Sequence, residues 1–173
     1  MARLFFYGFF YGIRSTFNLQ DTHFICTFTL PMSDSQHTHT ILYAEDDADD
    51  LYMVSQAFQQ FDGSIRLLHA QNGFETLKQL DELKSKGIMP CLVILDINMP
   101  GMDGKEALIR IKQSEEYKHI PAILFTTSSS NGDKKFAEIW GAYFITKPIM
   151  YDELETLAKT FVGHCESEVS KRA

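Results

Sequence analysis

From residue 40 onward, short apolar runs alternate with longer segments in which apolar residues recur every three or four positions. The short runs have the length of β-strands and comprise Ile41–Ala44, Ile65–Leu68, Cys91–Leu95, Ala122–Phe125 and Tyr143–Ile145. The longer segments have the period of amphipathic helices and follow each run in turn. Strands that alternate with helices predict an α/β fold, in which a doubly wound parallel sheet of five strands carries helices on both faces.

In a sheet of this class, ligands bind beyond the carboxyl ends of the strands. The residues that follow the apolar runs are therefore the candidates for chemistry. Glu45 and Asp46 follow the first run, Asp96 the third, Thr126 the fourth and Lys147 the fifth. We expect one edge of the sheet to gather three carboxylates, a hydroxyl and an ammonium group.

Carboxylate oxygens are hard ligands and favour Mg²⁺. A carboxylate beside a bound metal ion and a lysine can attack a phosphoryl group, because the two cations offset the charge on the phosphoryl oxygens. The edge therefore predicts a carboxylate that accepts phosphate with the help of Mg²⁺.

The acidic stretch EDDADD, residues 45–50, has two interpretations. Glu45 and Asp46 end a strand and are expected to face the cation. Asp47, Asp49 and Asp50 are expected to cap the next helix and to fill its first turn, where negative charge suits the helix dipole. Asp103, in the stretch MPGMDG, is likewise expected to be a turn or cap residue.

Four stretches together resemble bacterial response-regulator receiver domains of the CheY-like kind. They are ILYAEDDADD, LVILDINMPGMDG, FTTSSS and ITKP, in this order along the chain. The resemblance covers about residues 40–163 and implies a flavodoxin-like sheet with strand order 2-1-3-4-5. It also implies a Mg²⁺ cofactor and a sensor histidine kinase or phosphotransfer protein as phosphate donor.

The resemblance assigns roles around the metal and the phosphate. Asp96 matches the phosphorylated aspartate, and Asp46 and Asp96 match the direct Mg²⁺ ligands. Glu45 matches an acid that acts more through water, and Asn98 the position whose backbone carbonyl completes the metal ligands.

Three further roles concern the response to phosphate. Thr126 matches the hydroxyl that bonds to the phosphoryl group, and Lys147 the cation that contacts it. Phe144 matches the aromatic switch residue, although the stretch GAYFITK is one residue shorter than usual. The Lys147–Pro148 bond is expected to be cis, as the resemblance implies.

Three alternatives remain. A flavodoxin-like FMN binder would place phosphate after the first strand, where EDDADD would repel it. A phosphatase of the haloacid dehalogenase kind would need an aspartate where Asn98 stands, and a cap domain. A receiver that binds a partner without taking phosphate is the third.

Residues 1–39 differ from the rest, because aromatics crowd residues 1–32 without a clear period and the polar stretch SDSQHTH follows. The run from Leu4 to Ile13 is about half of the ~20 residues that span a bilayer. No small-residue cleavage site follows it. We expect an N-terminal extension that is disordered or a start-site artefact, with a docked segment or a targeting signal as alternatives. His37 and His39 lack a third metal ligand nearby.

Charge and cysteine content indicate which partners and which cell compartment to expect. The formal charge of −7 and the scattered Lys and Arg argue against nucleic acid as a partner. Cys26, Cys91 and Cys165 are odd in number and lack metal-ligand spacing, which favours reduced cysteines in the cytoplasm.

The predicted domain spans residues 40–163, with a tail at 164–173 that is too short for an output domain. We therefore expect a single-domain response regulator that signals to a downstream protein through a changed binding surface. Membrane and nucleic acid are not expected as partners. No enzyme activity is expected beyond self-phosphorylation and autodephosphorylation.

Overall fold

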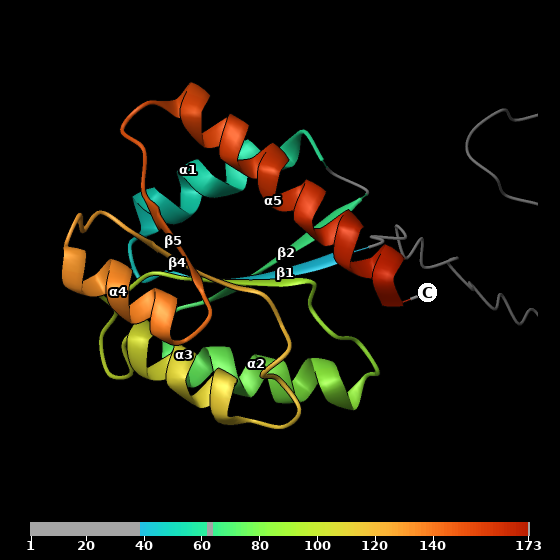
Figure 1. Cartoon of the computed structure of the whole chain (residues 1–173). Coiled ribbons are helices and arrows are strands. Elements are labelled where there is room, and N and C mark those ends of the chain that lie inside the picture. The colour runs from blue at the N-terminus through green and yellow to red at the C-terminus, as the bar shows by residue number, and fades with distance from the viewer. Residues whose placement is uncertain (1–38, 62–63, 173) are drawn as a thin grey trace, which may run out of the picture. The chain divides into compact units, whose positions relative to one another are not determined.

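The computed structural model describes residues 39–61 and 64–172 (Figure 1). The strands are β1 (His39–Ala44), β2 (Ile65–Ala70), β3 (Leu92–Leu95), β4 (Ala122–Thr126) and β5 (Tyr143–Thr146). The helices are α1 (Ala48–Gln59), α2 (Gly73–Ser85), α3 (Gly104–Gln113), α4 (Asn131–Ile139) and α5 (Tyr151–Arg172). The expectations for residues 1–38 lie outside the described residues.

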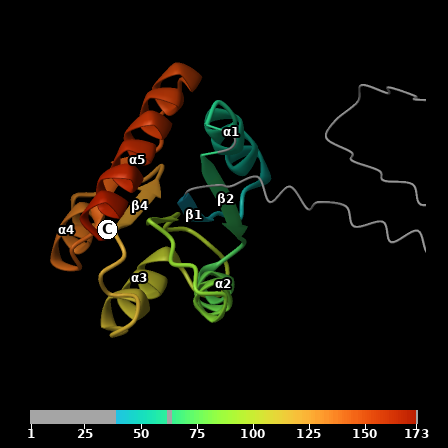
Figure 2. The same ribbon diagram turned by 90° about the vertical axis from the view of Figure 1, so that its right-hand side faces the viewer.

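All strand pairs are parallel, and the order across the sheet is β2-β1-β3-β4-β5. Helices α1 and α5 cover one face, and α2, α3 and α4 cover the other (Figures 1 and 2). The doubly wound α/β fold and the strand order predicted from the sequence are thus confirmed.

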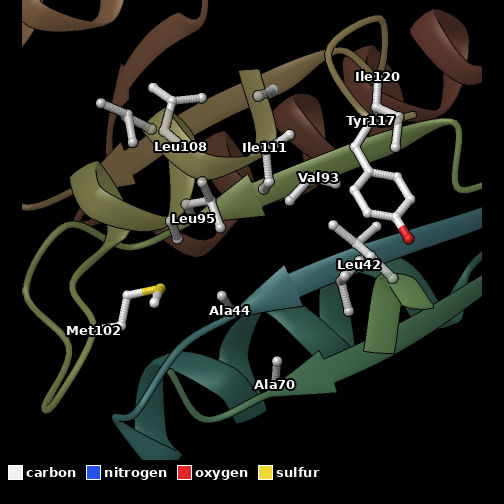
Figure 3. Close-up of a cluster of buried hydrophobic side chains, with 14 of the residues drawn as sticks. Leu42, Ala44, Ala70, Val93, Leu95, Met102, Leu108, Ile111, Tyr117 and Ile120 are labelled. Atoms are coloured by element: carbon white, nitrogen blue, oxygen red, sulfur yellow. The ribbon is translucent and has the colours of Figure 1, made fainter. Parts of the chain in front are cut away.

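Successive side chains of a strand point to opposite faces of the sheet. Since β1, β3 and β4 carry apolar residues at successive positions, both faces of the sheet are apolar. Leu42, Val93 and Leu95 belong to the core that also contains buried residues of α2, α3 and α4. Figure 3 shows the three side chains in one cluster with Leu108 and Ile111 of α3. Ile41 and Ile94 belong to the second core, under α1 and α5. This arrangement explains why the run CLVILD is apolar without alternation.

Helix α5 continues to Arg172, so residues 164–172, which were expected to be a tail after the last helix, are part of that helix. The apolar stripe of the helix does not stop at Phe161, because Val162 and Cys165 are also buried in the second core. Gly163 disfavours a helix by only about 1 kcal/mol, which packing of this stripe can offset. None of the helices within the described residues is long and apolar enough to cross a membrane.

Cys91 and Cys165 form a disulfide bond. Cys91 directly precedes β3, and both residues are buried in the core under α1 and α5. The expectation of reduced cysteines is therefore wrong for this pair. The 74 residues between the two positions gave no sign of the pairing, because the fold alone brings α5 over the start of β3.

Candidate functional site

The carboxyl ends of the strands bring the predicted polar residues to one edge of the sheet. Glu45 and Asp46 follow β1, Asp96 follows β3, Thr126 ends β4 and Lys147 follows β5. Glu45 is 2% exposed, Asp96 5% and Thr126 0%, whereas Asp46 is exposed at the rim. Two buried carboxylates at one edge need a positive partner, because an unpaired buried charge is strongly destabilising.

Lys147 is that partner. Its Nζ lies 2.6 Å from Glu45 Oε2 and 3.1 Å from Asp96 Oδ1. A third carboxylate, Asp50 Oδ2, accepts a hydrogen bond from the same Nζ at 2.7 Å. Burial lowers the pKa of Lys147, but the hydrogen bonds to Asp50 and Glu45 outweigh it and raise the pKa above its ordinary value. Lys147 therefore stays an ammonium group at neutral pH.

Glu45 is held on both carboxylate oxygens. Oε2 also accepts a hydrogen bond from the Tyr43 hydroxyl at 2.6 Å, and Oε1 accepts one from the Asp47 N–H at 3.2 Å. Burial raises the pKa of Glu45, and the hydrogen bonds from Lys147 and Tyr43 oppose this shift only in part. Burial, followed by the charge of Glu45, raises the pKa of Tyr43, so its hydroxyl remains a donor.

The carboxylates of Glu45, Asp46 and Asp96 form one cluster. One oxygen from each lies within 4.8 Å of the others. Such a spacing of hard oxygen ligands fits a small divalent cation. Asp46, which is exposed at the rim, is the member most open to a cation, whereas the oxygens of Glu45 and Asp96 also face Lys147 and backbone donors.

Asp96 is fixed by its own neighbours. Its Oδ2 accepts a hydrogen bond from the Asn98 N–H at 2.7 Å, while Oδ1 faces Lys147. The metal contact predicted for the Asn98 carbonyl stays a prediction. The N–H contact instead orients the carboxylate, a role that the sequence did not indicate.

Helix α3 begins against the backbone of Asp96. A Cβ on Gly104 would lie 2.0 Å from the Asp96 carbonyl oxygen, so only glycine fits there. The carboxylate of Asp103 accepts a hydrogen bond from the Glu106 N–H at 2.7 Å and caps α3, which confirms the predicted cap. The close contact of Gly104 with Asp96 could not be predicted from the sequence, because it depends on the folded chain.

Helix α1 begins at the same edge. Asp47 caps it and accepts hydrogen bonds from the Asp50 and Asp49 N–H groups, which lower the pKa of Asp47. The helix-start interpretation of Asp47, Asp49 and Asp50 is confirmed, but it is incomplete for Asp50. The contact of Asp50 with Lys147 was missed; its only signal was a place in the first turn of a helix that starts at the site.

The ends of β4 and β5 lie side by side. Thr126 Oγ1 accepts a hydrogen bond from the Ser128 N–H at 3.2 Å, and the Thr126 carbonyl accepts one from the Lys147 N–H at 2.8 Å. Phe144 pairs in register with Leu124 and packs, partly buried, against the core under α2, α3 and α4.

The Lys147–Pro148 bond is trans, because no peptide bond within the described residues is cis. The expectation of a cis bond is therefore wrong. A trans bond is the lower-energy form for X–Pro, and the chain reaches the start of α5 without the sharper turn that a cis bond provides.

A doubly wound sheet with an acidic cluster, a buried hydroxyl and a lysine at its carboxyl edge is the arrangement of receiver domains in two-component signalling. The chain belongs to the response regulator receiver domain family, whose model matches residues 41–159. Receiver domains bind a divalent metal ion and are phosphorylated by histidine kinases.

Two relatives support this family assignment. Protein PilH of Pseudomonas aeruginosa is 31% identical over 69% of this chain and 92% of its own length. Response regulator Rcp1 of Synechocystis is 33% identical over 59% of this chain and 71% of its own length.

Two solved structures share the fold. The phosphorylated cyanobacterial phytochrome response regulator RcpA superposes with a TM-score of 0.65 at 25% identity, over 70% of this chain and 89% of that one. The Mn²⁺-bound form of Rcp1 superposes with a TM-score of 0.61 at 25% identity, over 70% and 90%.

Proposed function

We propose that this receiver domain accepts one phosphoryl group on Asp96, with Mg²⁺ as cofactor, from a phosphohistidine of a sensor histidine kinase or phosphotransfer protein. The observation that carries the proposal is the pairing of a buried Asp96 carboxylate with Lys147 at 3.1 Å, beside the Glu45 and Asp46 carboxylates. RcpA is known in a phosphorylated form, which supports phosphate uptake. Rcp1 is known in a Mn²⁺-bound form, which supports the binding of a divalent cation.

In the transfer, an Asp96 carboxylate oxygen forms a bond to phosphorus, and the phosphorus–nitrogen bond of the donor breaks. The electron pair of that bond returns to the imidazole nitrogen, which takes up a proton from solvent. Bound Mg²⁺ supplies positive charge to the phosphoryl oxygens. Asp46 and Asp96 would hold the ion, with Glu45 acting through water and the Asn98 carbonyl as a further ligand.

Lys147 and Asn98 prepare Asp96 for this step. Lys147 keeps its proton, since its pKa is raised, and can donate to the phosphoryl oxygens as their charge grows. The Asn98 N–H holds one carboxylate oxygen, so the orientation of Asp96 is set before the donor arrives.

The signal would leave the site through Thr126. Its buried hydroxyl can turn and donate to a phosphoryl oxygen on Asp96, and the space it leaves can admit Phe144 from the neighbouring strand. The surface around β5 would then change, and this surface already exposes Ile139 and Tyr143. We propose that a downstream protein reads the change there.

The proposal includes a cytoplasmic location, which the cysteines no longer support. Disulfides are rare in the cytoplasm of most organisms, and Cys91 is bonded to Cys165. The location therefore rests on the expected kinase partner alone.

A small phosphodonor tests the function directly. With Mg²⁺, the full chain should gain the mass of one phosphoryl group, and removing the metal with a chelator should prevent it. Asp96→Asn should abolish the gain, because an amide is not a nucleophile. Asp49→Asn is the matched control and should leave the gain intact, since Asp49 is an exposed acid of the α1 first turn. Unchanged labelling of the Asp96→Asn protein would overturn the assignment.

A further inference from the structure

A chain of hydrogen bonds runs from Thr126 to helix α3. Thr126 Oγ1 accepts from the Ser128 N–H at 3.2 Å, and the Ser128 hydroxyl donates to Asp133 Oδ2 at 2.7 Å. The other oxygen of Asp133 accepts from Lys105 Nζ at 2.5 Å. Four residues from β4, the following segment, α4 and α3 are thus joined in series.

The far end of this chain returns to the phosphate site. Lys105 directly follows Gly104, which packs against the Asp96 backbone at the start of α3. The contacts therefore form a path that links the segment after Asp96 with the segment after Thr126. Lys105 Nζ also lies 5.5 Å from the centre of the aromatic ring of Phe136 in α4. This cation–π contact is a second interaction between Lys105 and α4.

The ion pair between Lys105 and Asp133 is partly shielded from water. The side chains of Lys105 and Asp133 are 33% and 14% exposed, compared with 52% and 48% for the Arg110–Glu106 pair on the outer side of α3. Shielded pairs interact more strongly than exposed ones. The hydrogen bonds from Lys105 and then Ser128 lower the pKa of Asp133, so it remains a carboxylate.

We propose that Ser128, Asp133 and Lys105 form a latch that holds residues 127–133 in the arrangement in which Thr126 Oγ1 accepts a hydrogen bond from the Ser128 N–H. When Thr126 turns its hydroxyl towards Asp96, Oγ1 leaves the Ser128 N–H unless this segment moves too. Ser128 is held by Asp133, and Asp133 by Lys105, so the segment resists the movement. The three are positioning residues for the switch, and the inference rests on the proposed function.

A latch of this kind lowers the affinity for any ligand that binds the switched state. A ligand that binds the switched state has an apparent affinity reduced by the fraction of molecules already in that state. Loss of a hydrogen bond to a charged group should raise this fraction, and hence the affinity, by about tenfold.

Beryllofluoride with Mg²⁺, used as a stable phosphoryl mimic on the full chain, provides the test. Ser128→Ala should bind it about tenfold tighter than wild type does, since the link between Thr126 and Asp133 is lost. Adding Asp133→Asn to that protein should tighten beryllofluoride binding little further, because both substitutions break the same contact between Ser128 and Asp133. NMR signals around Phe144 in the free variants should already lie part of the way towards the bound positions.

Two further variants separate the latch from general effects on the helices. Lys105→Gln removes the cation yet leaves the Asp133 charge in the first turn of α4, and should also tighten binding. Glu106→Gln breaks the exposed pair with Arg110 on the same helix and should leave the affinity unchanged.

The possible failures are distinguishable. If wild type binds beryllofluoride at Asp96 while Ser128→Ala and Lys105→Gln bind it equally or more weakly, the latch is wrong and the proposed function stands. If wild type neither binds beryllofluoride nor takes up phosphate, the proposed function is wrong and the latch falls with it.

Discussion

Strand β3 joins two very different ends of the sheet. Cys91 directly precedes its first residue and is bonded to Cys165 of α5, among buried apolar side chains. Asp96 directly follows its last residue and lies with Glu45 and Asp50 around Lys147. One end is therefore apolar and covalently joined, whereas the other gathers three carboxylates around one cation.

The difference indicates which end stabilises the domain and which end is kept for function. Grouped carboxylates repel each other and lose hydration, so the carboxyl edge is less stable than an apolar edge of the same size would be. The disulfide and the apolar cores can offset that loss from the opposite end. Natural proteins commonly retain destabilised sites where activity depends on them.

Removing the disulfide should have the largest effect on stability. The double variant Cys91→Ala and Cys165→Ala should lower the free energy of unfolding by about 4 kcal/mol, because the bond closes a long loop in the unfolded chain. Urea unfolding would measure this, and wild type with reductant should shift in the same direction. Phosphate uptake by the folded variant should persist; an unchanged urea midpoint would contradict the stabilising role of this end.

Filling the space behind Asp96 should have the next largest effect. Gly104→Ala places a Cβ against the Asp96 carbonyl oxygen, so the backbone must shift, at a loss of about 1–3 kcal/mol. Phosphate uptake should slow as well, because Asp96 moves with its backbone.

Gly163→Ala is the matched control for that change. Gly163 lies inside α5, and no atom outside its own helical turn lies within 4 Å of an added Cβ. The substitution should raise the stability by about 0.5–1 kcal/mol, through helix propensity, and leave phosphate uptake alone. Equal losses in both variants would mean that the contact of Gly104 with Asp96 is unimportant.

The smallest expected effect concerns two neighbouring acids of α1. Asp50→Asn should lower the stability by about 0.5 kcal/mol more than Asp49→Asn, because only Asp50 bonds to Lys147 and its side chain is 41% exposed. Both acids lie in the first turn, so their shared effect on the helix dipole cancels in the comparison. Identical urea midpoints would show that the Asp50 contact contributes nothing.

The fold and the centre of the site were predictable because they depend on periodic patterns and strand ends. Parallel strands bring their carboxyl ends together, so the rule that ligands bind there was enough to select Asp96, Thr126 and Lys147. The caps Asp47 and Asp103 were predictable for a similar reason, since capping is a local preference of short acidic side chains.

Other features depend on contacts between distant parts of the chain and could not be inferred from spacing. Cys91 meets Cys165 only because α5 runs on beyond Gly163. The same holds for Asp50, whose partner Lys147 is 97 residues further along the sequence.

The central claim is that the phosphoryl group forms an acyl phosphate on Asp96. Brief phosphorylation with a small donor and Mg²⁺, followed by borohydride, reduces an aspartyl phosphate to homoserine at the modified position. Mass spectrometry of the resulting peptides should find homoserine at position 96 and aspartate at positions 46 and 50. Homoserine at another acid of the cluster, or phosphate that stays on a histidine and resists reduction, would contradict the account.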